Sequence, residues 1–516
     1  MGRAARAPGI HPLVMLLSLV AITEVHGQWL TFHHAQTPPV SDDFQLGKLG
    51  WSLVTSEEHV VIGAPMAAGE GRVAVYDRSA FVAENIPFPH LLSDSLAGPG
   101  QRFGATLACD AGTIAVSNCS AFANGYCNDT AAWVYLYTLE AGSWQPEARI
   151  HRPAWAAGAF GHALALQGDV LAVGAERTTD PDPIQPVVYL YERTDGQWPL
   201  SPTDSLTSGQ SGDDGFGSAM AMDDDHLLVG ALGDGELVDS AGAAYLFRRT
   251  PDEWLFVRKL TASNGLANDR FGMAVALDGD QCVVGAPFHA VNGSNTGAVY
   301  HFSRDEGFPG NWGETQMIAP EVQRGGMGFG SSLALENDRL AIGSPNDTIF
   351  FPGVSGSLQV FSKTGGDWSF QQYISPTEEG LVSVGGRCAR ALAISEGVLL
   401  VATPWAAITG LTTEPSGGVL VYTSAIGMAE NEDAALTVWP VPAAGHVWIR
   451  IPGARFGTYR AVLHDALGRA VVRSLVPGPA DPFLLSLDGL AHGPWSITVS
   501  DVRTGVRIAS GRFIRE

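Results

Sequence analysis

The chain has 516 residues, of which 45% are hydrophobic and only 16% are charged, with 62 glycines and 31 prolines. This composition excludes a disordered chain and favours many short strands joined by turns. The net charge of -23, with 30 basic against 53 acidic residues, argues against nucleic acid or an anionic membrane surface as the partner.

The N-terminus has the pattern of an export signal. Arg3 and Arg6 precede an apolar run over residues 13–22, and the small-residue context of a cleavage site follows at Gly27. The run is too short to span a bilayer, and no later stretch reaches about eighteen apolar residues. We expect a signal peptide over residues 1–27, a mature chain without a transmembrane segment, and a secreted or cell-surface location. A membrane anchor or a buried helix is the alternative.

A unit recurs seven times, and successive units start 54 to 59 residues apart. Five units open with a Phe-Gly pair, and degenerate pairs at Leu49-Gly50 and Cys388-Ala389 open the first and the last. A Gly-Ala site or a variant of it follows 14 residues after the first position of every unit. Such regular spacing marks a repeat architecture. The clear pairs, all predicted to be structural, are Phe103-Gly104, Phe160-Gly161, Phe216-Gly217, Phe271-Gly272 and Phe329-Gly330.

Each unit has the pattern of four strands. In the fifth unit the first three are residues 273–277, 281–284 and 298–302, and the fourth opens at a tryptophan. Four strands per unit, seven units and no helical periodicity predict an all-β fold, a seven-bladed β-propeller over residues 28–424. The phenylalanine is expected to wedge between neighbouring sheets, contributing about 1.5–3 kcal/mol when buried. The recurrent tryptophans are Trp144, Trp198, Trp254, Trp312 and Trp368.

The seventh unit lacks a fourth strand of its own. Residues 28–32 repeat the tryptophan-strand pattern and place Trp29 as far before Leu49 as Trp368 lies before Cys388. We therefore expect residues 28–32 to complete blade seven, which joins the first and last blades and removes two exposed sheet edges.

Loop lengths suggest which face of the ring binds a partner. In antiparallel blades the 1–2 and 3–4 connections share one face, and the 2–3 and 4–1 connections share the other. The 1–2 turns are short throughout, whereas the 2–3 connections are long and differ from unit to unit. Variable loops on a rigid ring are typical of a binding surface, although idle, solvated loops are the alternative. The candidate binding residues are Phe288, His289, Phe350, Phe351 and Trp405.

The five cysteines fall into two groups. Cys119 and Cys127 lie in one 2–3 connection and are the candidate disulfide pair. Cys109, Cys282 and Cys388 belong to different units and are expected to be buried thiols.

A second module follows the ring. The repeat register stops after Ser424, and residues 425–433 have the composition of a linker. Residues 434–516 contain alternating apolar runs, which predict a small C-terminal β-sandwich.

The seven units resemble FG-GAP repeats, the blades of the integrin α-subunit head, and more closely the short bacterial form of that repeat in exported proteins. Integrin blades often hold calcium in a nine-residue acidic loop between strands one and two. Here that place holds only short turns such as Asp278-Gly279-Asp280. Because calcium takes about six to eight oxygen ligands, no metal site is carried over.

The tail resembles the C-terminal sorting domain of the type IX secretion system, which exports proteins of the Bacteroidetes group. The matching segments are Trp439-Pro440-Val441-Pro442, residues 465–469 and residues 511–515, although the family has asparagine where Val441 stands. The resemblance implies that the type IX machinery recognises residues 434–516, and that the protein is then released or attached to surface lipopolysaccharide.

Catalytic signatures are missing from the sequence. It contains no His-Glu-x-x-His zinc pair, no Gly-x-Ser-x-Gly elbow and no Cys-x-x-Cys. We therefore expect no catalytic residue, metal or cofactor, and a binding or adhesion propeller for a protein or glycan. A glycan-active enzyme with a carboxylate site at the axis is the first alternative. A structural surface component without a specific ligand is the second.

Overall fold

The computed structural model describes the seven blades and the strands of the tail. The described residues are 30–36, 48–82, 89–94, 102–118, 122–123, 126–127, 132–154, 156–177, 185–210, 214–306, 310–348, 354–377, 381–383, 385–407, 417–424, 437–439, 446–450, 458–464, 470–477, 483–487, 490, 492–501 and 507–515.

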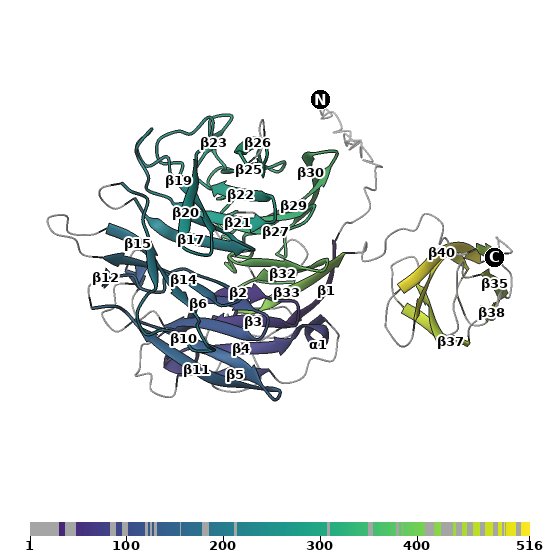
Figure 1. The fold of residues 1–516 in the computed structure, drawn as a ribbon. Helices are drawn as coiled ribbons and strands as arrows, with labels where there is room; N and C mark the ends of the chain where they lie inside the picture. The colour runs from purple at the N-terminus through teal and green to yellow at the C-terminus, as the bar shows by residue number, and fades with distance from the viewer. Residues whose placement is uncertain are drawn as a thin grey trace, which may run out of the picture.

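Seven antiparallel sheets follow one another along the chain, from purple to green in Figure 1. Six of them have four strands, and the sheet of blade three has five. The predicted all-β, seven-bladed propeller is confirmed. Blades one to three contain β2 (Ser52–Thr55), β3 (His59–Ala64), β4 (Arg72–Asp77), β5 (His90–Leu92); β6 (Phe103–Asp110), β7 (Thr113–Asn118), β10 (Trp133–Glu140), β11 (Ser143–His151); and β12 (Ala156–Gly158), β13 (Leu164–Gln167), β14 (Val170–Arg177), β15 (Gln185–Glu192), β16 (Asp204–Leu206).

The remaining blades have the same order, and blade seven takes one strand from the N-terminus. They contain β17 (Phe216–Asp223), β18 (His226–Ala231), β19 (Ala243–Arg249), β20 (Trp254–Leu260); β21 (Ala274–Asp278), β22 (Gln281–Ala286), β25 (Ala298–Arg304), β26 (Trp312–Ile318); β27 (Ser332–Glu336), β28 (Arg339–Ser344), β29 (Ser357–Thr364), β30 (Asp367–Ile374); and β31 (Leu392–Ser395), β32 (Val398–Ala402), β33 (Val419–Ser424), β1 (Leu30–Gln36).

The first strand of each blade, which in blade three is β13 because the short β12 is an additional strand, contacts the first strands of both neighbouring blades. The contacts run without a break from β2 through β6, β13, β17, β21, β27 and β31 and back to β2. These seven strands therefore surround the axis of the ring, and the chain segments that enter them lie at its mouth.

The ring is closed by β1, which pairs antiparallel with β33 of blade seven, with Leu30 opposite Ser424 and Gln36 opposite Val419 (Figure 1). The paired strand extends beyond the expected segment 28–32, whose residues 28 and 29 lie outside the described residues. Gln372 of blade six also holds this strand. Its side-chain oxygen accepts the Leu30 N–H at 2.8 Å, and its side-chain nitrogen donates to the Leu30 carbonyl at 3.0 Å.

The repeated phenylalanine packs between two blades. Phe271 is fully buried, and its ring centroid lies 5.5 Å from that of Tyr300 in its own blade. It shares one apolar cluster with Leu228 and Leu246 of the preceding blade. The glycine that follows has a positive φ, +92° at Gly272, which glycine adopts readily and other residues rarely do. The buried phenylalanines of the five clear pairs are Phe103, Phe160, Phe216, Phe271 and Phe329.

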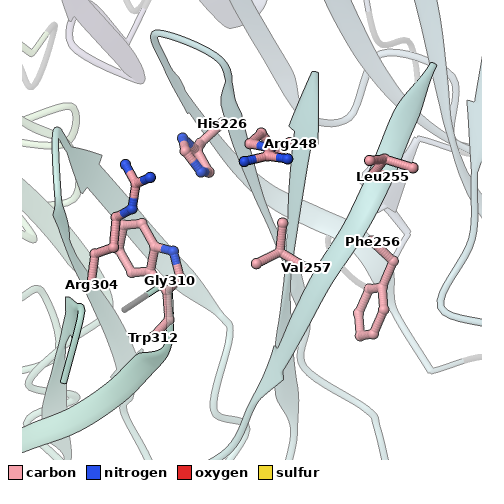
Figure 2. Close-up of a pocket in the computed structure, with 8 residues that line it drawn as sticks. All are labelled: His226, Arg248, Leu255, Phe256, Val257, Arg304, Gly310 and Trp312. Carbon is pink, nitrogen blue, oxygen red and sulfur yellow. The ribbon is translucent and has the colours of Figure 1, made fainter. Parts of the chain in front are cut away.

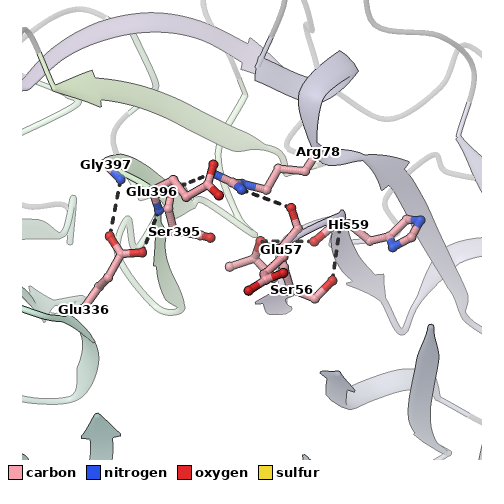
Figure 3. A network of polar contacts seen from close by, with 9 residues as sticks. Ser56, Glu57, His59, Arg78, Glu336, Ser395, Glu396 and Gly397 are labelled. Carbon is pink, nitrogen blue, oxygen red and sulfur yellow. Dashed lines mark hydrogen bonds and ion pairs between the residues drawn. The ribbon is translucent and has the colours of Figure 1, made fainter. Parts of the chain in front are cut away.

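Acidic side chains of the 1–2 turns link neighbouring blades. Asp278 accepts the backbone N–H of Asn337 in blade six, and Glu336 accepts the N–H of Glu396 in blade seven at 2.6 Å (Figure 3). The short turns that replace calcium loops in the sequence therefore hydrogen-bond to the adjacent turn.

Arg78 makes the corresponding link where the last blade meets the first. It opens the short helix α1 (Arg78–Val82), which follows β4. Its guanidinium donates to the carbonyls of Ser395 at 3.0 Å and Glu57 at 3.1 Å, and to the carboxylate of Glu396 at 2.8 Å (Figure 3). One nearly buried side chain thus joins blade seven to blade one.

The prediction that a fourth strand opens at Trp198 is wrong. The fourth strand of blade three, β16, begins only at Asp204, while Trp198 follows a bridge between Thr194 and Gln197. Pro199 and Pro202 explain the delay, because proline has no backbone N–H to give to a neighbouring strand. Trp198 is nevertheless buried in the core between blades two and three.

The tail contains two further antiparallel sheets, of three and four strands. This arrangement agrees with the expected small β-sandwich. No helix in the described part of the chain has the length and apolar content needed to cross a membrane. The strands of the tail are β34 (Thr437–Trp439), β35 (His446–Arg450), β36 (Thr458–His464), β37 (Ala470–Pro477), β38 (Phe483–Ser486), β39 (Gly493–Asp501) and β40 (Arg507–Arg515).

Candidate binding site

We call the side of the ring that carries the 2–3 and 4–1 connections the loop face. In blade five its 2–3 connection contains a small hairpin of β23 (Ala290–Val291) and β24 (Ser294–Asn295). A second small hairpin, β8 (Phe122–Ala123) with β9 (Tyr126–Cys127), lies in the same connection of blade two. These connections therefore contain local structure of their own.

His289, a candidate binding residue, is not accessible to a ligand. Its side chain is only 3% exposed, and Nδ1–H donates to the carboxylate of Asp269 at 2.7 Å. The same carboxylate accepts the backbone N–H of Leu266 at 2.7 Å. His289 and Asp269 therefore connect a 2–3 connection to the preceding 4–1 connection, which is a structural role. Sequence reasoning missed this because the partner belongs to a different connection.

Phe288, the residue before it, is accessible. The side chain is 42% exposed, and the Arg270 guanidinium lies 5.3 Å from the centre of its ring. Other large apolar side chains are exposed on the adjoining connections of blades four and five, with Leu237 as far as 73%. We call these residues the apolar group: Leu237, Val238, Leu266, Met273 and Phe288.

Buried aspartates hold the 2–3 connections in place. Asp234 accepts hydrogen bonds from the Tyr245 hydroxyl at 2.6 Å and the Lys259 ammonium at 2.9 Å. Burial alone would raise the pKa of Asp234, but the hydrogen bonds from Lys259 and Tyr245 outweigh it and lower the pKa. Asp347 occupies the same place in blade six. Each aspartate stands four residues after the glycine of its Gly-Ala or Gly-Ser site, which is the sequence signal that would have identified the pair.

Trp405, another candidate binding residue, lies in a group of aromatic and basic side chains. Its ring centroid is 5.1 Å from that of Trp51. The Arg390 guanidinium lies 4.5 Å from the centre of the Trp51 ring, and those of Arg390 and Arg387 lie 5.6 Å and 5.5 Å from the centre of the Trp405 ring. The Lys48 ammonium is 5.8 Å from that centre. We call these five residues the cationic cluster.

Three of the remaining candidates lie outside the described residues, namely Phe350, Phe351 and Cys119. The Cys119–Cys127 disulfide stays a prediction. Of the other cysteines, Cys282 and Cys388 are buried as expected, whereas Cys109 is half-buried, and desolvation raises the pKa of its thiol to about 12. Thiols in such surroundings are inert.

The opposite side of the ring has a cavity of about 250 Å³ between blades four and five (Figure 2). His226, Arg248 and Arg304 lie around its upper part and Trp312 lies below them. No carboxylate is among the described residues that line the cavity, but that of Asp225 lies 2.6 Å from Nδ1 of His226. No group of three or more histidine, cysteine or acidic residues in the described part of the chain is placed to hold a metal ion.

The family model for the FG-GAP repeat matches residues 206–247 and 254–302, which contain the Phe216-Gly217 and Phe271-Gly272 pairs. The search of curated proteins found no match. Among solved structures, the chain is similar to the β-propeller domain of the trilobed protease from Pyrococcus furiosus, which is described as having an open velcro topology. The identity is 11% and the TM-score 0.39, over 69% of this chain and 90% of that one. The strand pairing and the matched repeats define a seven-bladed β-propeller that contains FG-GAP repeats.

Proposed function

We propose that this protein is a secreted or cell-surface, non-catalytic propeller that binds a protein or glycan partner on its loop face. The observation that carries the proposal is the apolar group on blades four and five. FG-GAP repeats are typical of extracellular proteins, which supports the location.

The apolar group has the features of a docking surface. Its members come from the 2–3 connections of blades four and five and from the 4–1 connection between them. Large exposed apolar side chains that gather at one place mark interaction sites. The connections that carry them are fixed by buried Asp234 and by the His289–Asp269 pair. A rigid surface loses little conformational freedom on binding, which favours affinity.

Two buried acids of this region support a non-catalytic role. Asp234 and Asp269 are both buried, and both accept hydrogen bonds from groups that hold the loops. Their side chains therefore stabilise the surface. A general acid or base must instead reach the proton that it transfers.

The test begins with a search for the ligand, in which the full chain is immobilised and probed with extracellular proteins and with a panel of glycans. The triple variant Leu237→Ser, Leu266→Ser and Phe288→Ser is expected to lose at least about tenfold in affinity for the ligand found. Leu200→Ser is the matched control, because Leu200 is 74% exposed but lies in the 3–4 connection of blade three. Unchanged affinity in the triple variant would contradict the proposal. Turnover of a polysaccharide that stops on replacing one carboxylate near the axis would favour an enzyme instead.

We also propose that residues 434–516 direct export through the type IX secretion machinery. The sequence segments that resemble the sorting domain support this, and the two sheets of the tail suit a separate module. The test is mass spectrometry of the intact protein from culture medium and from washed cells, with and without residues 434–516. The shortened chain is expected to stay inside the cell. Unimpaired release of the shortened chain would refute the assignment.

A further inference from the structure

The cationic cluster is formed by three chain segments at the mouth of the ring. Lys48 and Trp51 lie just before β2, Arg387 and Arg390 just before β31, and Trp405 lies in the 2–3 connection of blade seven. Because β2 and β31 are first strands and contact each other, the cluster stands beside the axis, where blade seven meets blade one.

Within the described part of the chain, the charges in the cluster have no acidic partner. Other basic residues form ion pairs, as Arg78 does with Glu396 and Lys259 with Asp234. Among the described residues, no acidic side chain forms an ion pair with Lys48, Arg387 or Arg390. This occurs in a chain with 53 acidic and only 30 basic residues. Placing three like charges together without a counter-charge is unfavourable.

The pKa shifts of the basic side chains agree with this crowding of like charges. Burial and then the charge of Arg387 lower the pKa of Arg390, and burial lowers the pKa of Lys48. Arg390 is nevertheless exposed to solvent, as is Arg387. Because both guanidinium groups are exposed, an anion can reach them and would relieve the repulsion.

The two indole rings fix the direction in which the guanidinium groups can bind. A guanidinium that stacks on an aromatic ring uses its flat face and leaves its N–H groups free at the edge. The guanidinium of Arg390 lies 4.5 Å from the centre of the Trp51 ring, and that of Arg387 lies 5.5 Å from the centre of the Trp405 ring, which are distances that suit such stacking. The free edges match the two oxygens of a carboxylate, to which arginine donates two parallel hydrogen bonds.

From these features we infer that the cationic cluster is a binding site for a glycan that carries carboxylates, such as a chain of uronic acids. The partly exposed indoles supply flat apolar surface for the sugar rings, and the three cations meet carboxylates spaced along the chain. The site is separate from the apolar group on blades four and five, so the two assignments stand or fall independently.

Binding is tested on the full chain by the change in tryptophan fluorescence on adding an oligomer of galacturonic acid. An oligomer of galactose of the same length is the neutral counterpart. The acidic oligomer is expected to bind and the neutral one to bind at least about tenfold more weakly. Raising the salt concentration from about 0.05 M to about 0.3 M is expected to weaken binding of the acidic oligomer. Equal affinity for the two oligomers would overturn the inference.

Variants locate the site. Arg387→Gln together with Arg390→Gln is expected to lower the affinity for the acidic oligomer by at least about tenfold. Arg387→Gln alone removes an exposed side chain, so it is expected to fold normally and to weaken binding by about threefold. Arg249→Gln is the control, since Arg249 pairs with Glu192 between blades three and four. Undiminished binding in both cluster variants would refute the site. If the protein bound an oligomer of glutamate but not the oligomer of galacturonic acid, the site would be assigned to a protein partner and the inference would be overturned.

Discussion

The backbone of Gly272 packs directly against Gly230 of the preceding blade: a Cβ atom placed on Gly230 would lie 2.0 Å from the Gly272 carbonyl oxygen. The same contact joins Gly285 to Gly330, also at 2.0 Å. The glycine of each Gly-Ala site thus meets the glycine of the next Phe-Gly pair. A side chain at Gly230 or Gly285 would clash with this backbone, which explains why both positions are glycine in these blades.

Gly230→Ala is therefore expected to destabilise the ring by about 2 kcal/mol or more, since the clashing atom is backbone and has little freedom to move. Gly325→Ala is the matched control, because nothing lies within 4 Å of a Cβ there and, like Gly230, Gly325 has no positive φ. Urea denaturation measures both. Equal stability of the two variants would show that the close contact of the blades is not required.

Asp347→Asn is expected to destabilise the protein by about 2 kcal/mol, because it leaves Arg324 without its counter-charge. Asp347 is completely buried and accepts hydrogen bonds from Ser357 at 2.6 Å and from Arg324 at 3.0 Å. Asp280→Asn provides the comparison, since Asp280 pairs with Arg304 at the surface and its loss should change little. If thermal unfolding moved by the same amount in both variants, the buried pair would have no special role.

His301 makes stability depend on pH. Burial, and then the charge of Lys363 at 3.5 Å from Nε2, lower the pKa of His301 from 6.5 to about 4. Between these values the unfolded chain binds a proton that the folded chain does not. The contribution of His301 to the free energy of unfolding is therefore fully present above pH 6.5. It decreases by up to about 3 kcal/mol as the pH falls towards 4.

The measurement is urea denaturation at a series of pH values between 7 and about 4. His301→Gln is expected to show a shallower loss of stability over this window than the natural chain. His90→Gln, at an exposed position, should keep the original slope. Parallel curves for the natural chain and His301→Gln would rule out this origin of the pH dependence.

Gln372→Ala is expected to loosen the closing strand, since it removes both side-chain hydrogen bonds to the backbone of Leu30. The loss should be about 1–2 kcal/mol and confined to this part of the ring. Hydrogen exchange of the amides of residues 30–36 should therefore become faster. The neighbouring Gln371→Ala is the control, because the Gln371 side chain bonds only to Ser369 within the same strand. Unchanged exchange would show that pairing with β33 alone holds β1.

Features that repeat locally could be predicted from the sequence. The count of seven blades and the buried role of residues such as Phe271 follow from one spacing that recurs along the chain. Trp198 was misplaced because the tryptophan pattern took no account of the two prolines that follow it.

Contacts between distant connections could not be predicted in this way. His289 has the sequence of an exposed loop residue, and its burial depends on Asp269 in another connection. Trp405 was selected as a candidate, but its contact with Trp51 exists only because the two ends of the ring meet. The three cations near it are separated in sequence and have no common motif.

The origin of β1 at the start of the chain sets an order of events during synthesis. Leu30 is among the first residues to be made, yet its partner Ser424 leaves the ribosome almost four hundred residues later. At about 5–20 residues per second this delay lasts tens of seconds. Throughout that time β1 has no partner strand, so the ring is closed only after translation has passed the last blade. A chain that enters an export machinery before that point does so with its ring still open.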